Sequence, residues 1–377
     1  MSVPPPHLYR REALALGRDP RTIDRALEIQ GTVRAHGACP IYTLAHLAQL
    51  TGAPWRYLRE VVARRRDPYL DIDRRKRDGR TRPIASPEPV LMDVQRWILH
   101  NVLTACHVHP SSFAYQRHRS ILDCARMHLG ARWLIKLDVH DFFGTIHERR
   151  VYPIFTRLGY TRLLSLELTR LCTRVPPHEV ARRDYEKFRG KAPYAVSVEG
   201  RLPQGAPTSG ALANAIAARV DVRLSGLAQQ CGLVYTRYSD DLVFSAGQNF
   251  SRGKAADVAR RASAIIGREG FTPHRAKTRI VPPGARHIVL GLLVDDNRVR
   301  LLPEFKRRVE IHLRGVANFG LAEHARHRRF DSVLSMINHV DGCIAFAASV
   351  DPAFADDARD MWEEALRDRG YPDETVR

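Results

Sequence analysis

The segment from Tyr235 to Ser245, which reads Y-T-R-Y-S-D-D-L-V-F-S, constrains the fold of this chain more than any other. Apolar and β-branched residues lead into and out of a Ser239-Asp240-Asp241 corner, a pattern typical of a tight β-hairpin. Adjacent carboxylates at the tip repel each other, and a structural turn would more naturally use Asn-Gly or Asp-Gly. A bound divalent cation would remove the repulsion, because hard ions such as magnesium bind carboxylate oxygens. A solvated Asp-Asp turn is the alternative, and the segment alone does not decide between the two.

The charge balance indicates a polyanionic partner. The chain has 377 residues, with 60 Lys and Arg against 41 Asp and Glu, a formal net charge of +19. Counterion release would then drive much of the binding to a nucleic acid, although a generally basic proteome would also explain the excess. The six cysteines form no C-x-x-C pair, which argues against a disulfide framework or structural zinc. Without an apolar leader or a membrane-length run, we expect a cytoplasmic protein that binds no membrane.

The first part of the chain predicts helices followed by a basic hairpin. Residues 1 to about 65 read as helical, with two short helices broken at 51–54. Residues 64–82 are dense in arginine, and Asp78-Gly79 marks a turn that would place positive charge on two short strands. A solvated face and a phosphate-binding pair of strands both explain this charge.

The middle of the chain predicts a buried strand and a long helix. Residues 133–139 form a mostly apolar strand with Asp138 near its end, where an acid is costly unless it is functional or paired. Asp141 is better explained as a helix cap or surface acid. A Gly- and Pro-containing stretch, 200–209, then opens an Ala-rich helix to about Cys231. A second hairpin over 288–302 and three or four helices over 303–377 complete the chain.

One acid on a strand and two acids on a distant hairpin suit two-metal phosphoryl transfer. Four motifs together resemble those of reverse transcriptases in order and spacing. They are D-V-H-D-F-F at 138–143, L-P-Q-G-A-P-T-S-G-A-L-A-N at 202–214, Y-S-D-D at 238–241 and H-R-A-K-T at 274–278. The resemblance covers roughly residues 65–350 and is closest to the bacterial retron type.

The resemblance implies an α+β fold, a right-hand polymerase with a ferredoxin-like antiparallel palm, fingers and a helical thumb. On this basis we assign residues 1–65 to an N-terminal helical region. Residues 66–296 would form the fingers and palm, and residues 297–377 the thumb.

The resemblance also implies a metal site. Asp138, Asp240 and Asp241 would be the carboxylates that hold two Mg²⁺ ions, assisted by the carbonyl of Val139. Lys277 would protonate the departing pyrophosphate. Because Asp240 would face Asp138 across the metals, we expect it to be less replaceable than Asp241.

A nucleotide pocket is implied beside these acids. Phe143 lies five residues after Asp138, where the family has an aromatic sugar gate that leaves no room for a 2′-hydroxyl. A core aromatic beside Phe142 is the alternative reading of that ring. Gln204 would position the incoming dNTP, and Lys76 and Arg82 would hold its triphosphate.

Two elements frequent in retron enzymes, Asn-Ala-x-x-His and Val-Thr-Gly, each differ here at one residue. The corresponding positions read Cys124-Ala125-x-x-His128 and Val289-Leu290-Gly291, and Gly210 stands where a proline is common. Taken from the residues alone, Cys124 and His128 are more often core packing than metal ligands. The departures leave open a true retron enzyme and another bacterial defence-type reverse transcriptase.

The expected function is therefore RNA-directed DNA synthesis of the retron type. The partners would be a structured non-coding RNA that serves as template and primer, the DNA product, dNTPs and an effector protein, in anti-phage defence. Priming would start from a 2′-hydroxyl of the RNA. A group II intron-type enzyme is disfavoured by the short chain after the thumb-like helices. A catalytically silent RNA-binding scaffold is disfavoured by the intact set of acids.

Overall fold

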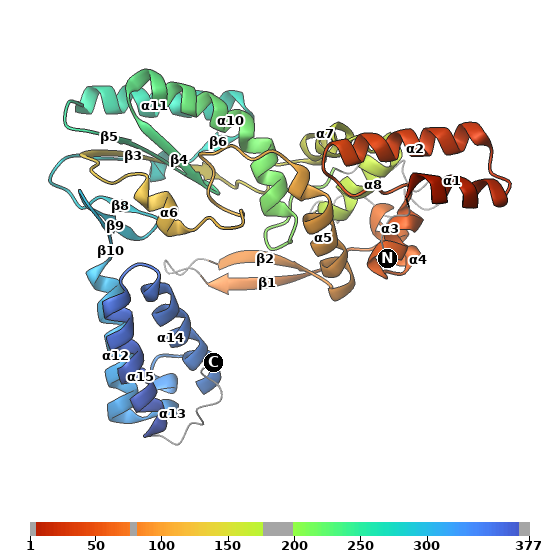
Figure 1. Ribbon diagram of the computed structural model, residues 1–377. Coiled ribbons are helices and arrows are strands. Elements are labelled where there is room, and N and C mark those ends of the chain that lie inside the picture. Colours follow the sequence, from red (N-terminus) through yellow and green to blue (C-terminus); the bar gives the residue numbers. More distant parts are fainter. Residues whose placement is uncertain (1–4, 76–80, 176–198, 369–377) are drawn as a thin grey trace.

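An antiparallel five-stranded sheet forms the centre of the molecule, which is known from a computed structural model that describes residues 5–75, 81–175 and 199–368 (Figure 1). Its strands are β3 (Trp133–His140), β4 (Val234–Tyr238), β5 (Asp241–Ala246), β6 (Thr272–Pro273) and β7 (Arg279–Val281). The spatial order is β4-β5-β3, and both β6 and β7 pair with the free edge of β3. Helices separate β3 from β4 and β5 from β6, so the connection is a split β-α-β-β-α-β unit. The predicted ferredoxin-like palm is confirmed.

Both faces of this sheet are covered, which explains the continuous apolar run in β3. Helices α10 (Ser209–Cys231) and α11 (Arg252–Arg268) pack on one face against Ile135 and Leu137. On the other face, Leu134 packs with α6 (Ile121–Arg126) and a small sheet. That small antiparallel sheet consists of β8 (Ile288–Val289), β9 (Leu292–Val294) and β10 (Val299–Leu301). Asp138 shares its face with Leu134, because side chains alternate along a strand.

Helices of the N-terminal side lie at one end of the basic hairpin, which extends away from them (Figure 1). They are α1 (Pro6–Ala15), α2 (Pro20–Ala35), α3 (Leu44–Thr51), α4 (Trp55–Val62), α5 (Pro89–Asn101), the short η1 (Leu103–Ala105), α7 (Glu148–Arg157) and α8 (Arg162–Cys172). The hairpin pairs β1 (Tyr69–Arg75) with β2 (Thr81–Pro87) in register from end to end. It is tied to the centre by Ala85, whose backbone N–H donates to the Gln204 carbonyl at 2.8 Å. The predicted basic hairpin is confirmed, and its Asp78-Gly79 turn lies outside the described residues.

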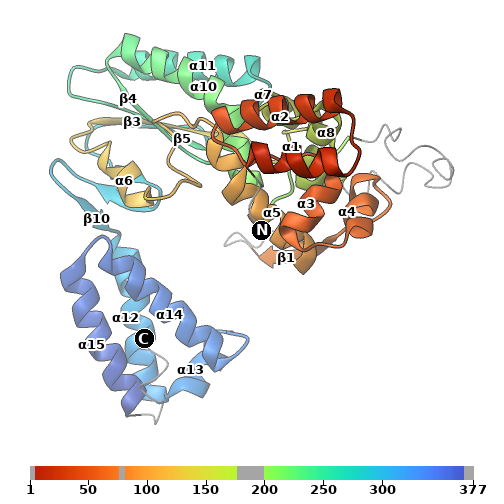
Figure 2. The same cartoon turned by 45° about the vertical axis from the view of Figure 1, so that its right-hand side comes forward.

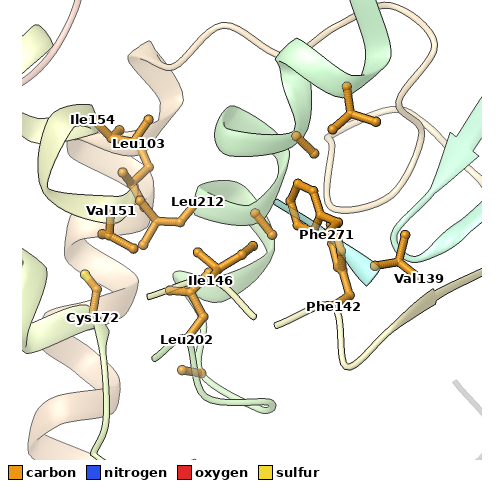
Figure 3. Close-up of a cluster of buried hydrophobic side chains, with 14 of the residues drawn as sticks. Leu103, Val139, Phe142, Ile146, Val151, Ile154, Cys172, Leu202, Leu212 and Phe271 are labelled. Atoms are coloured by element: carbon orange, nitrogen blue, oxygen red, sulfur yellow. The ribbon is translucent and has the colours of Figure 1, made fainter. Parts of the chain in front are cut away.

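One large hydrophobic core extends from the N-terminal helices to the central sheet. Val33, Leu47 and Leu58 of the first 65 residues belong to the same buried cluster as Leu137 and Phe244. Figure 3 shows a part of this cluster, in which Phe142 and Phe271 lie next to each other and Leu212 lies beside Val151. The rings of Phe142 and Phe271 stack at 5.5 Å. The N-terminal helices are therefore packed into the body of the molecule and share its core.

The C-terminal helices form a separate bundle with its own core around Trp362 (Figure 2). The bundle comprises α12 (Pro303–Phe319), α13 (Leu321–His327), α14 (Val333–Ala348) and α15 (Pro352–Arg367). A third cluster joins Ala347 and Ala355 of the bundle to β8–β10, and so attaches it to the sheet. These helices agree with those predicted over 303–377 as far as residue 368, and β10 lies within the hairpin predicted over 288–302.

Candidate active site

The register of the central strands brings the three predicted acids together. Asp138 of β3 lies directly opposite Asp241 of β5. Asp240 precedes β5 in the two-residue turn after β4, and its carbonyl accepts a hydrogen bond from the Val139 N–H at 3.0 Å. Directly opposed residues on antiparallel strands have Cβ atoms about 5 Å apart on one face. Like charges at such positions are destabilising, so the arrangement has a structural cost.

Asp138 contacts Lys277, a residue 139 positions away in sequence. The Lys277 Nζ donates to Asp138 Oδ2 at 2.7 Å, and the Asp138 side chain is only 9% exposed. The second oxygen, Oδ1, is buried and has no hydrogen-bond partner among the described residues. Lys277 ends the short helix η3 (Arg275–Lys277), which is held to β3 by the His274 N–H donating to the Asp138 carbonyl at 2.7 Å. A buried carboxylate oxygen that accepts no hydrogen bond from the protein is typical of a site that binds an ion or a ligand.

The two turn acids hold their protons more tightly than ordinary aspartates. Burial in the recess, together with the negative charges of Asp240 and Asp138, raises the pKa of Asp241 to about 6. Burial also raises the pKa of Asp240, and the charge of Asp138 adds to this effect. Among the described residues, no three histidine, cysteine or acidic side chains lie together closely enough to form a ready-made metal site. The oxygen donors nevertheless suit a divalent cation, which would relieve the repulsion that raises these pKa values.

The raised pKa of Asp241 predicts a pH-dependent stability of the metal-free protein. Between about pH 4 and pH 6 the folded state holds a proton that the unfolded state has released, so stability falls as pH rises through this window. We expect Asp241→Asn to remove that fall and to raise stability at pH 8 by about 1 kcal/mol, since solvent screens a partly exposed group. Urea unfolding at pH 4.5 and pH 8 without divalent ions measures the difference. A variant no more stable than the wild type at pH 8 would contradict it.

A recess of about 780 Å³ opens beside the acids on the face of the sheet opposite α10 and α11. Phe143 and Gln204 both line it, so the structure brings them to the acids as predicted from the sequence. Thr81 and Pro83 of the basic hairpin form part of the rim. The remaining lining residues include Tyr115, Ile121, Lys136, Val139, Asp141, Tyr238, Ser239, Lys277, Leu290 and Gly291.

The Gln204 loop approaches the basic hairpin closely. Gly205 has a φ of +123°, and a Cβ there would lie 2.8 Å from the carbonyl oxygen of Ala85. This close approach requires glycine after Gln204 and fixes the glutamine at the junction of hairpin and sheet. Phe143 is partly buried and packs edge-on against Phe142, with ring centroids 5.5 Å apart.

The two residues predicted to hold a triphosphate are described incompletely. Lys76 lies outside the described residues. Arg82 is on β2 opposite Arg74, and its side chain is likewise not described. Their role stays a prediction.

A buried ion pair behind the turn was not predicted. Arg237 of β4 is 1% exposed and forms a two-pronged contact with Asp221 of α10, at 2.8 Å from Nε and 2.7 Å from Nη2. Its Nη1 also donates to the carbonyl of Ser239, in the turn that carries Asp240, at 3.2 Å. The alternation of Tyr235 and Arg237 shows that they share a face, but an arginine is normally placed at the surface by sequence reasoning.

The Cys124 and His128 pair is core packing, as the residues alone suggested. Both side chains are buried, and the His128 ring bonds to Ser245 at 2.8 Å and to Thr236 at 2.7 Å. Burial lowers the pKa of His128 to about 4, so the ring is neutral at physiological pH. These contacts fix α6 against β4 and β5.

Comparison with known proteins agrees with the motifs. The family model "Reverse transcriptase (RNA-dependent DNA polymerase)" matches residues 74–294. The retron Mx162 reverse transcriptase of Myxococcus xanthus is 36% identical over 273 residues, which cover 70% of this chain and 55% of that protein. The retron Ec86 reverse transcriptase of Escherichia coli is 32% identical over 280 residues, 74% of this chain and 75% of that protein. The chain thus spans little more than half of the Myxococcus relative and three quarters of the Escherichia relative.

A foamy viral protease-reverse transcriptase in complex with double-stranded DNA aligns with a TM-score of 0.41 and 14% identity, over 78% of this chain and 38% of that chain. None of the helices in the described part of the chain has the length and apolar character needed to cross a membrane.

Proposed function

This chain belongs to the reverse transcriptase family, with bacterial retron enzymes among its relatives, and from this premise we propose that it synthesises DNA on an RNA template. The observation that carries the proposal is the opposition of Asp138 and Asp241 across β3 and β5, with Asp240 in the adjoining turn. One buried oxygen of Asp138 lacks a partner within the described residues. Three acids placed together at a structural cost suit nucleotidyl transfer.

Members of this family depend on divalent metal ions, and Mg²⁺ is the ion that we propose here. Asp138, Asp240 and Asp241, with the Val139 carbonyl, would hold two ions, which when bound lower the pKa of the attacking hydroxyl and neutralise charge on the pyrophosphate. Lys277 already reaches Asp138. We assign to its ammonium the donation of a proton to the departing pyrophosphate.

The recess beside the acids would receive the incoming dNTP. Gln204 would orient the nucleotide from the junction of the basic hairpin and the sheet, where its backbone is fixed by Ala85. Lys76 and Arg82 of the hairpin would bind the triphosphate. Phe143, held in place by Phe142, would lie beneath the sugar and exclude a 2′-hydroxyl.

The gate assignment predicts a change in sugar selectivity. In Phe143→Ala the space under the sugar opens, and we expect discrimination against ribonucleotides to fall by about tenfold to a hundredfold. Single-nucleotide incorporation with each dNTP and its ribonucleotide counterpart measures the ratio. Phe319→Ala, an aromatic truncation on the exposed end of α12, is the control and should leave the ratio unchanged. Unaltered selectivity in Phe143→Ala would show that another residue reads the sugar.

Extension of a labelled DNA primer on an RNA template tests the polymerase proposal. We expect the wild-type protein with Mg²⁺ and dNTPs to produce template-length DNA that survives alkali. If the protein binds the primer-template and yet adds no nucleotide, the enzymatic proposal fails and the scaffold alternative replaces it.

We further propose that the template and primer are one structured non-coding RNA, as in retrons, with priming from a 2′-hydroxyl. The support is the similarity to retron enzymes and the net charge of +19. Sequencing of the nucleic acid that co-purifies with the protein provides the test, and a branched RNA-DNA molecule is the expected result. Linear DNA alone would instead favour another defence-type or group II intron-like enzyme. Anti-phage defence with an effector protein is the proposed biological role, which plating efficiency of phage on expressing cells would measure.

A further inference from the structure

Tyr115 is a large aromatic residue that lines the recess and lies outside the set of residues assigned above to metal or nucleotide binding. The residue is 53% exposed, and it lines the recess between Phe143 and the turn that carries Asp240. The rings of Tyr115 and Phe143 meet edge-on with centroids 6.0 Å apart. The exposed part of Tyr115 is therefore directed into the space where the nucleotide is proposed to bind.

The hydroxyl of Tyr115 connects the ring to the catalytic turn. It lies 3.0 Å from the hydroxyl of Ser239, the residue that immediately precedes Asp240. Ser239 has a φ of +59°, a left-handed conformation that costs a non-glycine residue of the order of 1 kcal/mol or more. The contact with Tyr115 thus restrains the strained residue beside a catalytic acid.

Gly210 makes this position of the ring possible. A Cβ on Gly210 would lie 2.4 Å from Cγ and 2.6 Å from Cδ1 of Tyr115, distances that two unbonded carbons do not adopt. Gly210 is buried in the first turn of α10. Any side chain at this position, including the proline common in the family, would displace the ring from the place it holds here.

Buried polar side chains of α10 and β4 hold the loop that carries Tyr115. Asn214 of α10 donates to the carbonyl of Ala114 at 2.7 Å and accepts from the Ser112 hydroxyl at 3.0 Å. Arg237 also donates to the Ser112 hydroxyl, at 3.0 Å. Tyr115 itself has a φ of +58°, so the backbone is held in a strained conformation. An exposed aromatic ring held on strained backbone in a binding recess is an arrangement expected of a ligand-contacting residue.

We propose that Tyr115 is a second specificity-determining residue of the polymerase reaction, whose ring forms a wall of the nucleotide pocket beside Phe143. Its hydroxyl has a separate positioning role, through Ser239, on the turn that carries Asp240. This inference rests on the proposed function. It assigns the ring to nucleotide binding and the hydroxyl to the geometry of the reacting centre.

The two roles predict different kinetic effects. Tyr115→Ala removes the ring, so we expect KM for the dNTP to rise about tenfold, the size expected for losing one aromatic contact, with a loss of sugar discrimination. Tyr115→Phe keeps the ring and frees Ser239, so KM should stay near the wild-type value while kcat falls about threefold to tenfold, as for one neutral hydrogen bond. If Tyr115 had only a structural role, loss of the ring would not raise KM and lower selectivity while loss of the hydroxyl lowered kcat alone.

Single-nucleotide incorporation by the full chain on a saturating RNA primer-template, with dNTPs and ribonucleotides, measures these constants. Gly210→Ala should reproduce Tyr115→Ala, and the double variant should be no worse than either single one, because both remove the same ring contact. Gly226→Ala is the matched control on α10, since nothing lies within 4 Å of its added Cβ. It should behave as wild type.

The outcomes separate the two proposals. An inactive wild-type protein would refute the proposed function. An active wild type with unchanged KM and selectivity in Tyr115→Ala would refute the role of the ring alone. Equal kcat in Tyr115→Phe and wild type would refute the role of the hydroxyl.

Discussion

Asp240→Asn is expected to lower the rate of nucleotide incorporation by a factor of about 10³ or more, since losing several kcal/mol of metal stabilisation has an effect of that size. The substitution keeps the shape of the side chain and the turn, because the bond from the Val139 N–H goes to the Asp240 backbone. Asp241→Asn should retain more activity, because Asp241 is the more exposed of the two acids and solvent can partly replace its charge. Rates at saturating primer-template distinguish these variants.

The same substitution should leave folding and nucleic-acid binding intact. Burial and the charge of Asp138 raise the pKa of Asp240, so removing its charge relieves repulsion in the metal-free protein. We expect an Asp240→Asn protein that is inactive and at least as stable as the wild type. Asp257→Asn on α11, whose side chain is 46% exposed and pairs with Arg260, is the control for loss of one negative charge. A destabilised Asp240→Asn protein would mean that this acid has a structural role.

Asp221→Asn is expected to lower the free energy of unfolding by about 3–5 kcal/mol, the range for removing one partner of a buried ion pair. Arg237 and Asp221 are 1% and 0% exposed, so the guanidinium would remain buried without a countercharge. Tyr235 also donates to Asp221, at 2.8 Å, and that bond weakens with the loss of charge. Urea unfolding followed by circular dichroism measures the change.

Two further variants show whether the ion pair itself is responsible. The exposed pair of Asp257 and Arg260 is the control, and Asp257→Asn should cost less than about 1 kcal/mol. Combining Asp221→Leu with Arg237→Met should cost less than Asp221→Asn alone, because no buried charge is then left unpaired. If Asp221→Asn were as stable as the wild type, the buried ion pair would not stabilise this core.

The sequence was informative where local pattern determines structure. The hairpin over 235–245 and the helix from 209 to 231 were both predictable, because β-branched residues flank a short turn and small apolar residues follow a Gly- and Pro-containing loop. Gly232, with a φ of +66°, ends that helix as a left-handed cap. Asp240 and Asp241 lie in this hairpin and Asp138 lies on the apolar strand β3, so local motifs were enough to indicate the candidate site.

The contacts between distant segments could not be predicted in the same way. No local pattern indicates that Lys277 donates to Asp138, because only the pairing of β6 and β7 with β3 brings them together. The position of Tyr115 depends on the absence of a side chain at Gly210, a property visible only in three dimensions. Arg237 is charged and reads as a surface residue, yet the fold supplies Asp221 to neutralise it.

Incorporation of one templated nucleotide in a single turnover tests the central claim most directly. The wild-type protein and the Asp138→Asn and Asp240→Asn variants, each in excess over an RNA-templated DNA primer, receive Mg²⁺ and the dNTP complementary to the next RNA base. We predict that the wild type adds this dNTP and that both variants bind the primer-template without adding it at a comparable rate. Equal rates in all three proteins would show that polymerisation does not occur at the acids of β3 and the β4–β5 turn.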